Sequence, residues 1–147
     1  MNKAKDEAEI RKLMDDLAKA IHARGVDAAM SLHAPEVLTF DVVPPLSYEG
    51  AEAYRKSIER WFESYAGPIS FETPELSITV ADDVAFSHGL ARVSGSLKIG
   101  ETDYWVRRTT CFRKIDGKWL IIHEHISLPV EIPGGDLQSG KIAVLTP

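Results

Sequence analysis

Polar side chains recur at alternate positions in the segment from Trp105 to Pro129. Two runs rich in aromatic and β-branched residues flank Ile115-Asp116-Gly117, which is typical of a tight β-hairpin. If these three residues form the loop, one face of the hairpin collects Arg107, Thr109, His123, His125 and Ser127. Imidazole, guanidinium and hydroxyl groups can together hold ligand oxygens and move protons, so the sequence predicts a ligand pocket on this face.

The register of this hairpin has an alternative, because a two-residue turn at Asp116-Gly117 would shift the pairing by one residue. Arg107 lies beside His125 in the first register, whereas Arg108 takes that place in the second. Strict alternation along the strand keeps both histidines on one face in either register. The opposite face is mainly apolar with three polar exceptions, and it comprises Val106, Arg108, Thr110, Phe112, Leu120, Ile122, Glu124 and Ile126.

Asp41 lies between Phe40 and Val42 in an otherwise apolar run. A buried carboxylate costs free energy unless it is paired or protonated, and burial raises its pKa toward the range of a general base. The alternative is a strand-end aspartate that faces solvent or caps the turn at Pro44-Pro45. Asp41 is therefore the first catalytic candidate, and the two histidines, His123 and His125, are the next.

The remaining candidates would bind the ligand. Arg107 could receive a carboxylate or enolate oxygen, or it could form an internal salt bridge, for example to Asp41. Thr109 and Ser127 would be neutral hydrogen-bonding groups at the same level. Three further ligand-binding candidates, whose orientation the sequence leaves open, are His88, Trp61 and Tyr65.

Composition and spacing exclude several classes of function. His123 and His125 lack a third ligand, because Glu124 points to the opposite face, so neither a metal nor a cofactor is predicted. The single Cys111 excludes an intrachain disulfide and fits a reducing cytoplasm. A formal charge of -5 without a basic cluster argues against nucleic acid. No signal peptide is visible and no apolar run approaches the ~20 residues of a membrane span, so we expect a cytoplasmic protein with no membrane contact.

The element pattern is three helices followed by an antiparallel meander. Apolar residues at three- and four-residue steps predict helices over 6–24, 26–33 and 50–65. Alternating runs predict strands over 37–43, 69–81, 84–98, 102–114 and 118–128. This order is typical of an α+β fold, with a curved antiparallel sheet wrapped around the N-terminal helices as a cone-shaped barrel with a pocket. Residues 1–129 would form a single domain, and residues 130–147 an extended C-terminal tail.

With these elements the chain resembles the nuclear transport factor 2-like superfamily, the α+β cone with a cystatin-like fold. The resemblance covers roughly residues 6–129, and it is carried by residues 17–25, residues 34–50 and D-G-K-W-L-I-I-H-E-H-I-S-L-P at 116–129. Within the superfamily the chain is most similar to SnoaL-like, ketosteroid-isomerase-related proteins. The closing hairpin also resembles the association domain of calcium/calmodulin-dependent kinase II, in which an R-x-T strand precedes D-G-K-W and H-x-H-x-S.

The resemblance to ketosteroid isomerase implies a role for Asp41. This residue stands where that family keeps its general base, at the end of the first strand and nine residues before Gly50. The family's oxyanion hole uses a tyrosine on the first helix and a protonated aspartate on a later strand, and the matching positions here are Ala18 and about Thr109. Both donors are missing, so we do not expect steroid isomerisation by that mechanism. Proton transfer at Asp41 remains the expectation.

The sequence thus favours a small-molecule-binding domain that acts on a small carbonyl-bearing substrate as a cofactor-independent isomerase, cyclase, hydratase or lyase. One alternative is a ligand-binding or oligomerisation module without turnover, and another is an accessory subunit of a biosynthetic pathway. The expected partner is a small apolar or acidic molecule. All three readings predict a homodimer, because an outer sheet face bearing Val106, Leu120 and Ile122 is too apolar to remain in water.

Overall fold

The computed structural model describes residues 2–131 and 143–144. The three helices in this part of the chain are α1 (Lys3–His22), α2 (Val26–Met30) and α3 (Ala51–Glu63). The strands are β1 (His33–Phe40), β2 (Tyr48–Glu49), β3 (Tyr65–Glu72), β4 (Ser77–Ala81), β5 (Val84–Leu97), β6 (Gly100–Ile115), β7 (Lys118–Ser127), β8 (Val130–Glu131) and β9 (Ala143–Val144). The predicted α+β order is confirmed, with helices first and the long strands afterwards.

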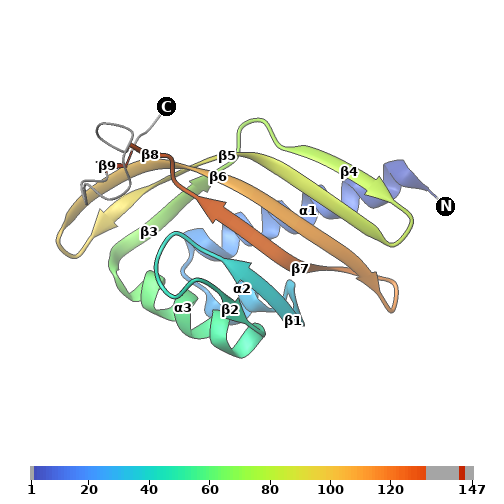
Figure 1. The fold of residues 1–147 in the computed structure, drawn as a ribbon, viewed down its shortest axis with the longest axis horizontal. Helices are drawn as coiled ribbons and strands as arrows, with labels where there is room; N and C mark the ends of the chain where they lie inside the picture. Colours follow the sequence, from blue (N-terminus) through green and yellow to red (C-terminus); the bar gives the residue numbers. More distant parts are fainter. Residues whose placement is uncertain (1, 132–142, 145–147) are drawn as a thin grey trace.

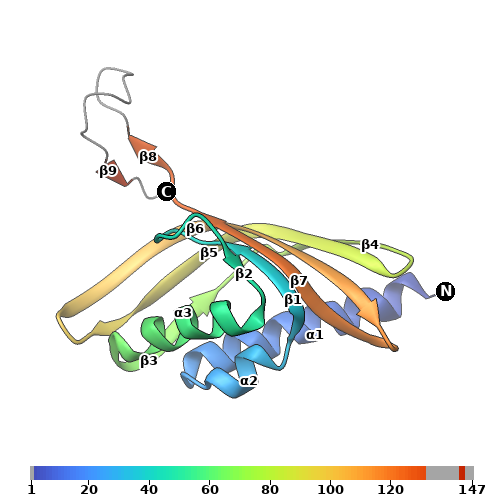
Figure 2. The ribbon, with the colours of Figure 1, turned by 60° about the horizontal axis from the view of Figure 1, so that its bottom comes forward.

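The helices pack on one face of a strongly curved, unclosed sheet (Figures 1 and 2). Helix α1 begins at Asn2, whose side chain accepts a hydrogen bond from the Lys5 backbone nitrogen at 3.1 Å. Its apolar residues recur on the side that faces the sheet, and the buried ones include Ile10, Leu13, Met14, Leu17 and Ile21. Helix α3 covers the sheet beside α1 and buries Tyr54, Ser57, Ile58 and Phe62.

The strand order is β2-β1-β7-β6-β5-β3, and β4 also pairs with β5. The meander from β5 to β7 is antiparallel as predicted, but β1 pairs with β7 in parallel, so the sheet is mixed. A parallel pair requires a long crossover, and here α3 and the meander supply it. The predicted strand 69–81 is two strands, β3 and β4, because the chain turns at Pro74, which has no amide hydrogen to donate.

The hairpin between β6 and β7 adopts the shorter of the two predicted turns. Ile115 pairs with Lys118, so the turn consists of Asp116 and Gly117 alone. Their φ angles are 50° and 79°, the positive values that a type I′ turn requires at both positions.

A β-bulge in β7 then changes which residues face the helices. Phe112 pairs with Ile121 and Cys111 pairs with His123, so Ile122 is an extra residue without a partner on β6. Trp119 and Ile121 are buried before the bulge, whereas Glu124 is buried after it. The strict alternation assumed from the sequence is therefore wrong along β7.

The short turn and the bulge together reverse the predicted orientation of the polar and apolar faces. The turn places the even-numbered residues of β6 toward the helices, and the bulge brings Glu124 and Ile126 of β7 to the same side. Val106, Arg108 and Thr110 of β6 are buried under the helices together with Glu124. Arg107, Thr109 and His125 are exposed on the other side of the sheet. Val106, which was expected on an outer face between two subunits, is instead covered by the helices of the same chain. Pairing of two subunits through the outer face of the sheet stays a prediction.

The C-terminal tail lies mostly outside the described residues. Within the described part, β8 pairs with β9 in a separate two-stranded sheet. The division into a domain of residues 1–129 and a tail of 130–147 stays a prediction. Among the described helices, none has the length and apolar character needed to cross a bilayer.

Candidate functional site

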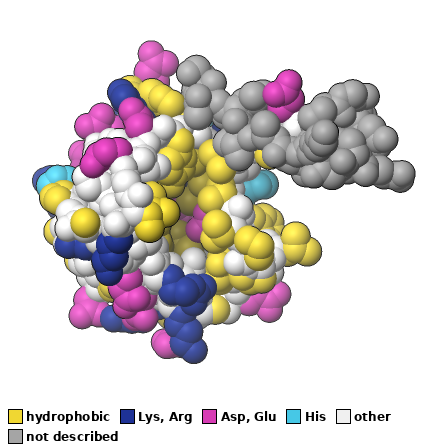
Figure 3. All heavy atoms as spheres, turned by 90° about the vertical axis from the view of Figure 1, so that its left-hand side faces the viewer, with side chains coloured by type: hydrophobic (Ala, Val, Ile, Leu, Met, Phe, Trp, Pro, Cys, Tyr) yellow, Lys and Arg dark blue, Asp and Glu magenta, His cyan; other side chains and the backbone are white. Residues whose placement is uncertain are grey.

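A cavity of about 300 Å³ lies between the inner face of the sheet and helices α1 and α3. In Figure 3 it is a hollow ringed by hydrophobic side chains, with an acidic side chain in its depth. Most of its wall is apolar or aromatic, from Leu17, Ile21, Ala29, Val42, Val43, Pro44, Ile58, Trp61, Phe71, Val93, Val106 and Ile126. The polar members are His33, Asp41, Tyr48, Tyr54, Ser57, Arg60, Tyr104 and Arg108. A concave apolar wall with a few convergent polar groups is the usual form of a small-molecule site.

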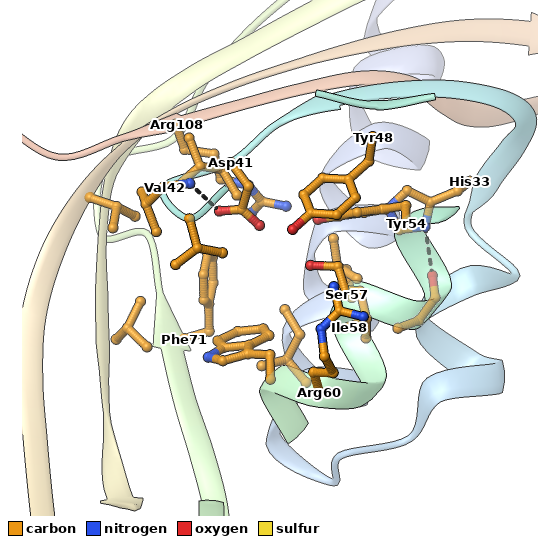
Figure 4. A pocket seen from close by; sticks show the side chains of 18 of the residues that line it. His33, Asp41, Val42, Tyr48, Tyr54, Ser57, Ile58, Arg60, Phe71 and Arg108 are labelled. Carbon is orange, nitrogen blue, oxygen red and sulfur yellow. Dashed lines mark hydrogen bonds between the residues drawn. The ribbon is translucent and has the colours of Figure 1, made fainter. Parts of the chain in front are cut away.

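Asp41 follows β1 directly and points its carboxylate into this cavity (Figure 4). Its Oδ1 accepts a hydrogen bond from the Val42 backbone nitrogen at 2.7 Å. Burial raises the pKa of Asp41, and the negative charge of Glu124 raises it further. The Val42 hydrogen bond and Arg108 act in the opposite direction without reversing the shift. A raised pKa makes a carboxylate a stronger base once it is ionised.

Arg108 and Glu124 form a buried ion pair on the sheet side of the cavity. Arg108 donates from Nε to Oε2 of Glu124 at 3.0 Å and from Nη2 to Oε1 at 2.7 Å. The Thr110 hydroxyl lies 3.3 Å from the same Oε1. The guanidinium carbon also lies 4.9 Å from the centre of the Phe71 ring. Because the side chains are 6% and 1% exposed, the two charges neutralise one another inside the protein.

His33 lines the cavity from the start of β1. Its Nδ1 lies 2.8 Å from the Ala29 carbonyl oxygen, which can only accept, so Nδ1 carries the hydrogen. Burial lowers the pKa of His33, although the charge of Glu124 opposes this. The ring is therefore neutral near pH 7, and its Nε2 is left as a hydrogen-bond acceptor.

Three hydroxyl groups of the cavity come from β2 and α3, and a fourth, that of Tyr104, comes from β6. Tyr48 donates to the Pro44 carbonyl oxygen at 3.1 Å, which ties β2 to the loop after Asp41. Tyr54 and Ser57 come from α3, and Figure 4 shows both side chains extending from the helix into the cavity. Burial raises the pKa of Tyr54 well above its usual value, as do the charges of Glu124 and Asp41, so its hydroxyl stays protonated.

The model of the SnoaL-like domain family matches residues 10–131, which is most of the chain. The chain belongs to the SnoaL-like family. It is thereby a member of the nuclear transport factor 2-like superfamily, as its sequence predicted. The comparison with curated proteins finds no match.

Solved structures of similar fold carry several descriptions. An NTF2-like protein of unknown function from Pseudomonas putida KT2440 is 28% identical, with a TM-score of 0.83 over 99% of both chains. A candidate calcium/calmodulin-dependent protein kinase II association domain from Xanthomonas campestris is 23% identical, with a TM-score of 0.72 over 86% of this chain and 87% of that one. A candidate dehydratase from Streptomyces avermitilis is 14% identical, with a TM-score of 0.77 over 86% and 97%. The last two show the fold alone.

Of the residues predicted for the site, Asp41 and Trp61 line the cavity of this SnoaL-like domain. Tyr65 does not; it is buried beside the cavity, with its ring edge against Trp61 at 6.3 Å. The predicted grouping of Asp41 with the polar hairpin residues in one cavity is wrong. The two-residue turn places Arg107 and Thr109 of β6 on the outer face of the sheet, and the bulge at Ile122 places the histidines of β7 there too.

The predicted hairpin residues form a separate group on that outer face. Arg107 donates from Nε to the Ser127 hydroxyl at 3.0 Å, and Thr109 pairs with His125. His123 lies 2.7 Å from the Leu38 carbonyl oxygen through Nδ1. His88, on the neighbouring strand, is exposed and stacks on Phe86 with 6.4 Å between ring centres. Any catalytic or ligand-binding role for this group stays a prediction.

Sequence reasoning missed most of the polar cavity residues, namely His33, Tyr48, Tyr54, Ser57, Arg108 and Glu124 as the partner of Arg108. A signal for the ion pair was present, because Arg108, Thr110 and Glu124 interrupt a face that is otherwise apolar. Tyr54 lies in the apolar stripe of α3, where an aromatic residue is more often part of the core. His33 and Ser57 stand in no motif.

The size and lining of the cavity in this domain suit a small molecule. Among the described residues, no group of three His, Cys, Asp or Glu side chains lies together in a way that could hold a metal ion. The cavity instead offers a carboxylate, neutral donors and one neutral imidazole acceptor within a largely apolar wall. We conclude that this is a small-molecule-binding domain.

Proposed function

We propose that the protein catalyses cofactor-independent proton transfer on a small, largely apolar carbonyl compound, with Asp41 as the general base. The observation that carries this proposal is the position of Asp41. Its carboxylate enters a mainly apolar cavity, and burial raises its pKa. An ionised carboxylate that is poorly solvated gains most from taking up a proton, so it is a stronger base than one in water.

The apolar wall sets the character of the substrate. Val93, Val106 and Ile126 on the sheet and Ile58 and Trp61 on α3 face the same space. A ligand there would displace water from the surroundings of Asp41, which strengthens its electrostatic interactions with the reacting atoms. The substrate is therefore a compact molecule with one polar function near Asp41 and an apolar remainder.

Deuterium exchange tests this proposal without knowledge of the natural substrate. Acetophenone, a small apolar ketone, would be incubated with the protein in deuterium oxide, and its methyl hydrogens followed by NMR. We expect the wild type to accelerate exchange and Asp41→Asn to lose roughly 10²–10⁴-fold of that acceleration, because the amide keeps the size but not the base. Asp83→Asn, which changes an exposed aspartate, serves as the matched control. Equal acceleration by the Asp41→Asn protein would refute the base assignment.

A non-catalytic ligand-binding or oligomerisation module is the second candidate. One argument for it is the fold shared with the candidate kinase II association domain of Xanthomonas campestris. The other is that Arg108 and Glu124, two charged groups at the cavity, are bound to each other rather than to a ligand. In that case Asp41→Asn would change the affinity for acetophenone and its pH dependence, and the wild type would not accelerate exchange.

A further inference from the structure

Two hydroxyl groups in the cavity have no partner in the fold. Tyr54 and Ser57 are 5% and 7% exposed, and both line the cavity. Among residues 2–131, neither hydroxyl forms a hydrogen bond. Because both hydroxyls face the cavity, they can give their hydrogen bonds to a ligand without breaking a contact within the protein. The pair is therefore suited to a ligand atom that accepts hydrogen bonds.

Several neighbouring donors are already in use, although Nη1 of Arg108 donates to no group among residues 2–131. The Tyr48 hydroxyl donates to the Pro44 carbonyl oxygen at 3.1 Å. The His33 Nδ1–H donates to the Ala29 carbonyl oxygen at 2.8 Å. Arg108 directs Nε and Nη2 to Glu124 at 3.0 Å and 2.7 Å. The hydroxyls of Tyr54 and Ser57 are thus available neutral donors on the helix side of the cavity, and Tyr104 lies on the sheet side.

The spacing of the pair brings the two hydroxyls together. Residues three apart in an α-helix lie on the same face one turn from each other, so Tyr54 and Ser57 address one region of the cavity. In Figure 4 they extend toward the space into which Asp41 points its carboxylate from the other side. An oxygen atom held by the pair would leave the neighbouring carbon turned toward Asp41.

We propose that Tyr54 and Ser57 jointly bind the carbonyl oxygen of the substrate, and that the substrate is a neutral ketone or enone rather than a carboxylic acid. This assignment rests on proton transfer by Asp41 as proposed above. The carbon–hydrogen bond next to the carbonyl breaks, and its proton goes to the Asp41 carboxylate. The electron pair forms a carbon–carbon double bond, and the negative charge moves to the oxygen between the two hydroxyls. Return of the proton to another carbon gives an isomer, with no oxidant or reductant needed.

The charges of the cavity explain why a neutral substrate is favoured. The positive charge of Arg108 is matched by Glu124, and Asp41 adds a second negative charge beside them. A carboxylate ligand near Asp41 would face two anions and one cation that is already paired. Among the described lining residues, the other cation is Arg60, which is exposed at the mouth of the cavity. An acidic ligand would therefore bind at the mouth, away from Asp41.

Three probes of similar size test the assignment: acetophenone, ethylbenzene, which lacks the oxygen, and benzoate, which carries a charge. Isothermal calorimetry would measure their affinities for the wild type, Tyr54→Phe, Ser57→Ala and the double variant. We expect each single change to weaken acetophenone about threefold to tenfold while ethylbenzene changes less than twofold. Tyr65→Phe is the matched control, because Tyr65 is a buried tyrosine outside the cavity. Wild type that binds ethylbenzene as well as acetophenone, or benzoate better than acetophenone, overturns the assignment.

The exchange reaction separates this inference from the proposed function. Tyr54→Phe and Ser57→Ala should each slow acetophenone exchange at saturation by at least roughly tenfold, since the donors matter most when the oxygen carries charge. If exchange depends on Asp41 but not on Tyr54 or Ser57, the proposed function stands and this inference is wrong. If acetophenone binding depends on the two hydroxyls but no exchange occurs, the oxygen site stands and the catalytic role of Asp41 fails.

Discussion

Asp41 carries an ionisable carboxyl group in a mainly apolar environment that disfavours its charged form. The Val42 amide is its hydrogen-bond donor, and the nearest charges are the Arg108 cation and the Glu124 anion. The raised pKa shows that burial outweighs the favourable contacts. An ionised carboxylate in such an environment lowers the stability of the folded protein. Groups of this kind are common at functional positions, where activity is gained at the expense of stability.

This conflict predicts a dependence of stability on pH. The folded protein holds the Asp41 proton more tightly than the unfolded chain, so ionisation destabilises the fold as pH rises from 3.8 through the raised folded value. Asp41→Asn removes this penalty. We expect the variant to be about 0.5–2 kcal/mol more stable than wild type at neutral pH, in denaturant titrations. The difference should shrink as the pH falls below 3.8, where the wild-type carboxyl is protonated in both states.

The control for this prediction is Asp83→Asn, whose exposed side chain should leave the stability difference near zero at every pH. An Asp41→Asn protein that is less stable than wild type at pH 7 would show that Asp41 is held by favourable contacts. The high pKa would then be the wrong description of the site.

At single positions, the sequence predicted Asp41, whose charge stands out beside an apolar strand, and missed the cavity residues whose place depends on long-range packing. Asp41 stood out because a carboxylate followed an apolar strand. His33 lines the cavity only because α2 ends beside β1, and its ring nitrogen is fixed by the Ala29 carbonyl oxygen. Ser57 depends on how α3 rotates over the sheet. No local sequence pattern indicates either the position of His33 or that of Ser57.

At the level of elements, one extra residue in β7 decides what faces the cavity. Before Ile122 the odd-numbered residues of β7 face the helices, and after it the even-numbered ones do. A single inserted residue is invisible to a period-two pattern, because a sheet accommodates it by a local kink. The sequence therefore predicted both strands and the position of the turn between them. The three-residue loop from which its pocket face was built is wrong, and the histidines of β7 lie on the opposite face of the sheet.

The Arg108–Glu124 pair links β6 to β7 just beyond this bulge. Each partner is buried, so removal of one leaves an uncompensated charge. We expect Arg108→Met to lower the free energy of unfolding by about 3–5 kcal/mol in urea titrations at pH 7.

The double variant Arg108→Met with Glu124→Leu provides the test of this explanation. With both charges gone, apolar side chains of similar volume fill the space, and most of the lost stability should return. A double variant that is as unstable as Arg108→Met alone would show that packing around the guanidinium, including its contact with Phe71, matters more than charge pairing.

For the whole molecule, the order of elements was predictable and the arrangement of the sheet only in part. Helical periods changing to alternating runs near Gly67-Pro68 predicted three helices covering a meander, which the structure confirms. The parallel pairing of β1 with β7 was not predicted, since it joins strands at opposite ends of the domain. This pairing brings Asp41, at the end of β1, close to Glu124 on β7.

The outer face of the sheet carries apolar side chains on β5 among the polar ones. Val84, Phe86 and Leu90 project outward from β5 at 44%, 44% and 48% exposure. Because this end of β5 lies between β6 and β4, the Val84 and Phe86 side chains of this apolar stripe are inside the sheet rather than at an edge. Aromatic and aliphatic residues at the centre of a patch with polar residues around it are typical of subunit interfaces. We propose that two copies of the chain pair through this stripe.

Substitution of Phe86 by Glu tests this assembly. A charge at the centre of the stripe would be buried without a partner in a dimer, whereas in a monomer it would remain in water at little cost. We expect light scattering at micromolar concentration to give a dimer for wild type and a monomer for Phe86→Glu, with unchanged acetophenone binding because the cavity lies on the other face. Glu101→Lys, which changes an exposed residue at the tip of β6, is the control and should stay dimeric. A monomeric wild type would exclude the stripe as an interface between copies.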